Sequence, residues 1–184
     1  MSNKEEILLS FFYAWGKTKR NNEKIPSVTH LQKEIFLLSR RTQFSTEKDL
    51  FKFIPLWYGP FSIDLSQELT DLQNKGFVGY DELSLSKNGF KEASIAWNKL
   101  SDYEKKQIID VKSTYNFFST TELIDHVYSM YPKFTKKSAL KKEVVDQYFS
   151  GYLKENNLTE EDAVSAVILA KKNMRERDAS SYRY

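Results

Sequence analysis

The run FIPLWYGPFS at positions 53–62, with the residues that follow it, decides the fold of this chain. Gly59 permits a sharp change of direction, because glycine adopts backbone angles that are closed to other residues. Pro60 has a fixed φ angle and no backbone N–H, which suits the first position of a helix. The apolar residues that follow recur at helical spacing, namely Phe61, Leu65, Leu69 and Leu72. We therefore expect a helix between Gly59 and Lys75, with Gly76 just after its end.

The residues after this helix predict a two-stranded ribbon. A strand over residues 77–80 would turn at Asp81 and Glu82 and return over residues 83–85. Ser86 can then cap another helix. A helix, a ribbon and a second helix are the outline of a winged helix, in which the ribbon is the wing.

Most of the remaining chain is expected to be helical. Expected helices cover residues 5–17, a segment from Thr29 to Arg41, residues 88–99, a segment from Ser101 to a break at residues 112–118, a segment from Ser119 to Tyr131, and a last helix from Thr159. Thr29 with Gln32, and Ser119 with Glu122, have the spacing of a capping box. We expect a mainly α protein with a winged-helix-like domain over residues 1–99. A helical C-terminal region over residues 100–184 would pack on it, with a frayed tail at 178–184.

Composition limits the function classes. The chain has 184 residues, of which 40% are hydrophobic and 29% are charged, so we expect a true core and a soluble surface. It has no apolar run near the roughly 20 residues that cross a bilayer, and its first residues do not resemble a secretory signal. The absence of cysteine excludes thiol chemistry and fits a cytoplasmic protein. A net charge of +3 permits nucleic-acid binding without implying it.

Three short motifs carry a resemblance to a known family. The run LQKEIFLL at 31–38 resembles the Leu-Gln-Lys helix of the Panacea domain, which is also called the SocA-like antitoxin domain. The run WYGPFS at 57–62 resembles the aromatic-Gly-Pro signature of that family. The run LIDHVYSMYP at 123–132, followed by KKS at 136–138, is similar to a segment of bacterial and archaeal relatives. The resemblance implies a small helical regulator or antitoxin, and it supplies no catalytic residues.

The aromatic-Gly-Pro signature is interpreted as a structural motif. It consists of Trp57, Tyr58, Gly59, Pro60 and Phe61. Aromatic side chains at such a turn usually bury their large apolar area, so we expect Trp57 and Phe61 to be core residues.

Two basic segments are the candidate contact sites for a nucleic acid or another partner. The candidates are Lys17, Lys19 and Arg20 in the first segment, and Lys133, Lys136, Lys137, Lys141 and Lys142 in the second. Tyr131 and Phe134 are interleaved with the second, a pattern that suits phosphate contacts with stacking. The commoner interpretation of such charge runs is a solvated loop.

An enzyme is not expected. His30 and His126 are far apart, and neither has metal-ligand spacing around it, so both are interpreted as structural or surface residues. The sequence lacks a P-loop, a dinucleotide-binding glycine pattern and a nucleophile elbow. We therefore expect no catalytic residues, no cofactor and no metal.

Two classes of partner stay open. The expected recognition helix carries three carboxylates, Asp64, Glu68 and Asp71, against one lysine, Lys75, and would meet phosphates badly. Its amide side chains could contact bases, but it has no arginine. The sequence thus favours a protein partner, such as a toxin, with an apolar anchor at Val164, Val167 and Ile168. That anchor is equally compatible with a homodimer or a simple core. Duplex DNA bound through the basic loops is the alternative.

Overall fold

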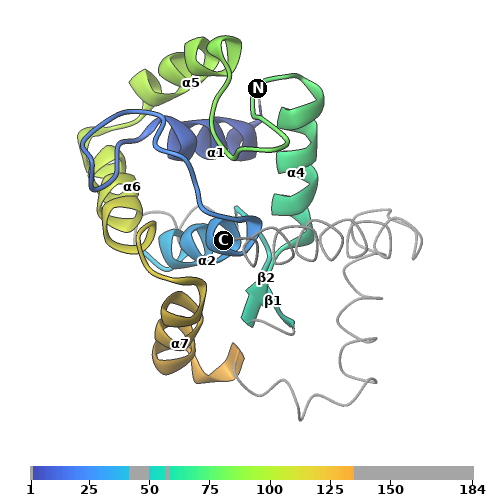
Figure 1. Ribbon diagram of the computed structural model, residues 1–184, viewed down its shortest axis with the longest axis vertical. Helices are drawn as coiled ribbons and strands as arrows, with labels where there is room; N and C mark the ends of the chain where they lie inside the picture. The colour runs from blue at the N-terminus through green and yellow to red at the C-terminus, as the bar shows by residue number, and fades with distance from the viewer. Residues whose placement is uncertain (1, 42–49, 57–58, 135–184) are drawn as a thin grey trace, which may run out of the picture.

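The computed structural model describes residues 2–41, 50–56 and 59–134 (Figure 1). The fold is mainly helical, as expected, with one small antiparallel sheet in the described part. The elements in chain order are α1 (Asn3–Tyr13), α2 (Val28–Ser39), β1 (Ile54–Leu56), β2 (Gly59–Phe61), α4 (Ile63–Asn74), α5 (Lys87–Lys99), α6 (Asp102–Tyr115), α7 (Thr120–Met130) and the 3₁₀ turn η1 (Pro132–Phe134). No helix among these is long and apolar enough to cross a membrane.

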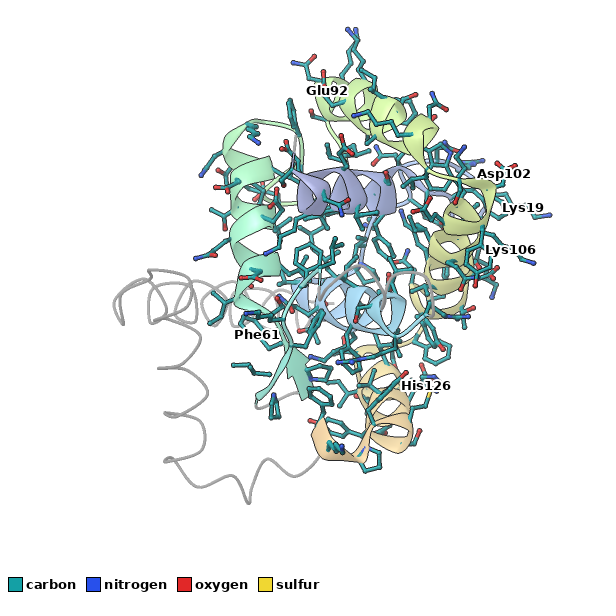
Figure 2. All side chains as sticks on the ribbon, turned by 180° about the vertical axis from the view of Figure 1, so that it is seen from behind. Lys19, Phe61, Glu92, Asp102, Lys106 and His126 are labelled. Carbon is teal, nitrogen blue, oxygen red and sulfur yellow. The ribbon has the colours of Figure 1, made fainter. Side chains whose placement is uncertain are left out.

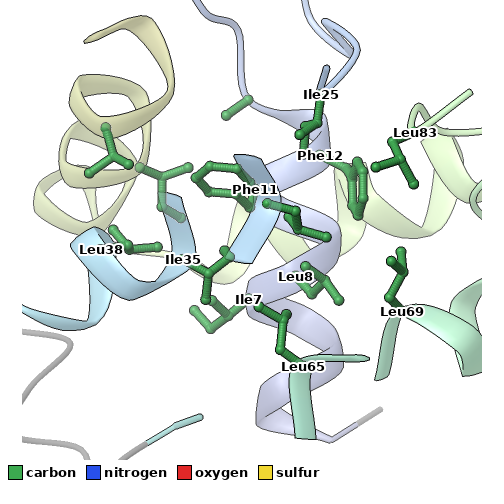
Figure 3. Packing of buried hydrophobic residues seen from close by; sticks show 14 of the residues in the cluster. Ile7, Leu8, Phe11, Phe12, Ile25, Ile35, Leu38, Leu65, Leu69 and Leu83 are labelled. Atoms are coloured by element: carbon green, nitrogen blue, oxygen red, sulfur yellow. The ribbon is translucent and has the colours of Figure 1, made fainter. Parts of the chain in front are cut away.

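Helices α1 and α2 form the centre of the molecule. Figure 1 shows α4 on one side of this pair and α6 on the other, with α5 beside α1 and α7 beside α2. Buried side chains of α1 and α2, such as Phe11 and Ile35, meet Leu65 and Leu69 of α4 in the core (Figure 3). Ile108 of α6 and the buried side chains of α7 belong to the same cluster. The described part of the C-terminal region therefore shares one hydrophobic core with the N-terminal helices.

The helix after Gly59 begins later than the sequence predicts. Its N-cap is Ser62, whose Oγ accepts a hydrogen bond from the Leu65 N–H at 3.3 Å. Gly59 and Pro60 belong to strand β2, which pairs antiparallel with β1. Proline is tolerated there because both strands of a two-stranded sheet are edge strands. The predicted C-terminal end is confirmed, since Gly76 follows the helix with a φ of +69°.

The expected wing is reduced to isolated bridges. The chain turns back over residues 77–85, but Val78 pairs with Leu85 in a single bridge. Leu83 pairs instead with Ile25, and both of these side chains are buried. The expected second strand over residues 83–85 therefore pairs with two different segments, through Leu83 to Ile25 and through Leu85 to Val78. The regular two-stranded sheet precedes α4 instead of following it.

Other helix boundaries also differ from the expected ones. Helix α1 ends at Tyr13 and not at residue 17, because Ala14 leaves the helical conformation. The N-cap of α2 is Ser27 and not Thr29. Helix α6 continues to Tyr115, through part of the predicted break at residues 112–118.

The caps of the later helices are confirmed. Ser86 caps α5, and the Ser119–Glu122 capping box begins α7. Ser101 caps α6 and forms a second capping box. Helix α7 ends at Met130, one residue before the predicted end, and Tyr131 is its C-cap residue before Pro132. The predicted helix from Thr159 and the frayed tail lie outside the described residues.

Candidate functional site

The first two motifs of the family resemblance meet in one buried junction. The Ser62 N–H donates to Gln32 Oε1 at 2.8 Å, and Gln32 Nε2 donates back to the Ser62 carbonyl oxygen at 3.0 Å. The same Nε2 group also donates to Ser66 Oγ at 3.0 Å. Lys33 Nζ donates to the Pro60 carbonyl oxygen at 3.0 Å. The Leu-Gln-Lys motif of α2 therefore holds the backbone of the aromatic-Gly-Pro motif.

The third motif closes the same junction from α7. Gly59 has a φ of +93°, a conformation that L side chains rarely adopt. A Cβ atom at this position would lie 3.0 Å from Tyr128 Cε1 and 3.5 Å from Lys33 Cε. Tyr128 belongs to the run at 123–132, so three segments that are distant in sequence converge here. Because its polar groups bind backbone atoms of the chain itself, the junction is a structural site.

The aromatic signature is described in part. Phe61 is buried, which confirms its expected role in the core, and Figure 2 labels it at the sheet. Trp57 and Tyr58 lie outside the described residues, so the burial of Trp57 stays a prediction.

A lysine that the sequence analysis missed lies in the core. Lys112 of α6 is 0% exposed, and its Nζ donates to the carbonyl oxygens of Phe11, Phe12 and Ala14 at 3.1, 2.9 and 2.8 Å. These carbonyl groups lie at the C-terminal end of α1, where the helix dipole favours a cation. Burial lowers the pKa of the Lys112 ammonium to about 8, and the charges of Glu34 and Glu23 partly offset this effect.

A buried glutamate was also missed. Glu34 of α2 is 0% exposed, and neither carboxylate oxygen has a hydrogen-bond partner within the described residues. Burial raises the pKa of Glu34 well above its ordinary value; Lys112 opposes this effect and Glu23 adds to it. Helical spacing could have predicted the burial of both charged residues. Glu34 lies three residues after Leu31, and Lys112 lies four residues after Ile108, so each shares a helix face with a buried apolar side chain.

Both histidines take part in internal contacts. His30 Nε2 lies 2.9 Å from the Phe118 carbonyl oxygen, so this nitrogen donates, and Nδ1 lies 3.0 Å from Ser27 Oγ. Burial lowers the pKa of His30, and the hydrogen bond to Phe118 partly offsets this effect. His126 Nε2 lies 3.1 Å from the Tyr115 hydroxyl oxygen. Within the described ranges, no group of three or more residues that could bind a metal is present.

The structure does not bring the two basic segments together where they are described. Lys17, Lys19 and Arg20 are exposed in the loop between α1 and α2 and form no ion pair with a described residue. Lys17 Nζ lies 5.6 Å from the centre of the exposed ring of Phe117, which follows the end of α6. Figure 2 shows Lys19 on the same edge of the molecule as Lys106 of α6.

The second basic segment is described at one residue only. Lys133 is exposed in η1, at the bottom of Figure 1, whereas the loop between α1 and α2 lies at the left edge, level with α1. The other candidates of this segment lie outside the described residues, namely Lys136, Lys137, Lys141 and Lys142. The proposed anchor at Val164, Val167 and Ile168 lies outside them as well.

Two ion pairs involve α4 and its C-cap residue. Lys4 Nζ lies 2.9 Å from Asp64 Oδ2, and Lys75 Nζ lies 2.8 Å from Glu5 Oε1. Glu68 remains on this helix, and burial raises its pKa, with further contributions from Glu5 and Asp71. The nearby cations Lys75 and Lys4 oppose this rise in the pKa of Glu68.

Comparisons with known proteins found no protein-family model, no curated protein and no solved structure that matches this chain.

Proposed function

We propose that this chain is a non-enzymatic regulatory protein that acts by binding another protein, as antitoxins of the Panacea or SocA-like type do. The proposal joins the motif resemblance to the character of the buried polar residues. The side chains of Gln32 and Lys33 donate hydrogen bonds to backbone groups of the chain, and Lys112 donates to carbonyl groups at the end of α1. Groups used in this way are not free to hold a substrate.

The observation that carries the choice of a protein partner is the charge around α4. Lys4 and Lys75 neutralise Asp64 and Glu5, and the carboxylates of Glu68 and Asp71 have no ion-pair partner in the described part of the chain. A helix that enters the major groove passes between two rows of phosphates and needs positive charge beside it. Helix α4 is therefore better suited to face a protein than to face DNA.

Duplex DNA remains the second candidate, and a different surface supports it. Lys17, Lys19 and Arg20 are exposed and without ion pairs among the described residues, and Lys106 lies on the same edge (Figure 2). Lysine and arginine side chains on one edge can contact successive phosphates without using α4 at all.

Two kinds of crosslinking in the cells that make the protein would separate the candidates. A tagged full-length chain is crosslinked with ultraviolet light in one sample and with an amine-reactive reagent in another. The proposal expects an adduct with one defined protein in the second sample, and a complex of fixed stoichiometry when that protein and this chain are purified and mixed. Nucleic-acid adducts in the first sample, together with no defined protein adduct in the second, would reject the proposal in favour of the DNA alternative.

A further inference from the structure

The buried pair of Glu34 and Lys112 has two alternative hydrogen-bonding arrangements. The three hydrogens of the Lys112 ammonium are used by three carbonyl oxygens of α1 and its end. Glu34, on the neighbouring helix α2, interacts with Lys112 electrostatically, but the two form no direct ion pair in this structure. The ammonium can satisfy the α1 carbonyl groups or a Glu34 carboxylate, but it cannot fully satisfy both.

The state of Glu34 decides between these arrangements. An ionised carboxylate that is fully buried without a donor is costly, and such a group usually takes up a proton instead. A protonated Glu34 makes no strong demand on Lys112, which agrees with the observed bonds to α1. An ionised Glu34 would attract Lys112, because a buried charge is tolerated when it is paired.

We propose that Glu34 holds a proton in the folded protein and that loss of this proton draws Lys112 away from the α1 carbonyl groups, which loosens the end of α1 and the loop over residues 14–24. Two hydrogen bonds hold this loop in place. The Glu23 Oε1 atom accepts from the Thr18 N–H at 3.2 Å, and Asn116, the C-cap residue of α6, donates through Nδ2 to the Lys24 carbonyl oxygen at 2.9 Å.

The neighbouring groups set the direction of the response. Glu23 has a buried Oε2 atom without a partner in the described residues, and its negative charge favours the protonated form of Glu34. Lys112 favours the ionised form. Ser10 of α1 and Asn116 after the end of α6 supply further buried oxygen atoms without a described partner, and neither residue is ionisable. His30, one helical turn before Glu34, is bonded to the Phe118 carbonyl group.

We call the Glu34–Lys112 pair, with the bonds of Lys112 to the end of α1, the latch. The loop that it holds carries Lys17, Lys19 and Arg20. The latch would therefore link proton release to the presentation of a surface that is exposed to partners. This inference does not depend on which class of partner the chain binds.

The first test is a carbon-13 NMR titration of the glutamate side-chain carboxyl groups in the full chain. We expect Glu34, assigned by its absence in Glu34→Gln, to ionise at a pH well above that of an ordinary glutamate, about 4.3. A Glu34 signal that titrates near the ordinary value would overturn the proposal. If Glu34→Gln does not fold, assignment by through-bond experiments on the wild type replaces it.

The second test is hydrogen exchange of the amides of residues 14–24, compared at matched pH. The wild type should lose protection as pH rises through the Glu34 transition, and Glu34→Gln, which keeps the neutral shape, should not. Glu92→Gln, on the partly exposed side of α5, is the matched control and should behave as wild type. The same loss of protection in Glu34→Gln would overturn the latch, even if Glu34 is protonated.

The third test is the direction in which folding stability changes with pH. The unfolded chain ionises Glu34 at lower pH than the folded chain, so between the two values the folded state binds more protons and stability falls as pH rises. The unfolding equilibrium constant of the wild type, relative to that of Glu34→Gln, should increase by up to about tenfold per pH unit in this window. A ratio that is constant with pH would contradict the proposal.

Discussion

Replacing Gln32 by alanine removes the centre of the junction between the first two motifs. The Ser62 N–H, which is fully buried, loses the acceptor that lies 2.8 Å away. The Ser62 carbonyl oxygen keeps its hydrogen bonds from the Ser66 N–H at 3.3 Å and the Ser66 hydroxyl at 3.2 Å. Losing the bond from Gln32 therefore costs this oxygen less than it costs the Ser62 N–H. One buried donor without a partner costs about 1–3 kcal/mol, and with the space left by the side chain we expect unfolding to become about 2–4 kcal/mol easier.

The assay is urea unfolding followed by far-ultraviolet circular dichroism. Gln67→Ala is the matched control, because Gln67 lies partly exposed on α4, outside the junction, and its replacement should change stability by about 0.5 kcal/mol or less. The reasoning is refuted if Gln32→Ala is no less stable than Gln67→Ala. That result would mean that water or a rearranged backbone replaces the bonds of Gln32 without cost.

Two further perturbations follow from the same geometry. Gly59→Ala should cost about 2–4 kcal/mol in urea unfolding, because it adds the strain of positive φ to a close contact with Tyr128. Gly76→Ala has positive φ but nothing within 4 Å, and should cost only about 1–2 kcal/mol; equal losses would argue against the contact. The lowered pKa of His30 means that the unfolded chain binds its proton first as pH falls. Stability should therefore decline below about pH 6.5 in the wild type and less so in His30→Gln, and identical pH profiles would refute the burial argument.

The helix ends that were predicted correctly have local signals. Ser101 and Ser119 each lie three residues before a glutamate and accept a hydrogen bond from its backbone N–H. The hydroxyl group, the carboxylate and the N–H groups that they satisfy all lie within one turn, so the sequence contains the complete interaction. Gly76 is a similar case, since only the backbone angle at a single residue is involved.

The junction could not be predicted because its partners are remote. Gln32 has the spacing of a capping box with Thr29, but its side chain bonds with Ser62, thirty residues away. Pro60 suits the start of a helix, but pairing with β1 holds it in an extended conformation. Lys112 lies in a polar stretch, and its burial depends on carbonyl groups of α1 about one hundred residues earlier. For Gln32 and Pro60, sequence spacing predicts an interaction close by in the chain, but the observed partner is brought there by the tertiary fold.

The central claim is that the partner is a protein and not DNA, and a salt titration of binding to random-sequence duplex DNA tests it most directly. Full-length wild type is compared with two charge-reversed variants. One changes Lys17, Lys19 and Arg20 to glutamate, and the other changes Lys133, Lys136 and Lys137. We expect no measurable affinity at physiological salt, and no difference between the wild type and either variant. Wild-type binding that weakens steeply with salt, at a log–log slope of about −0.9 per phosphate contact, and that either variant abolishes would contradict the claim.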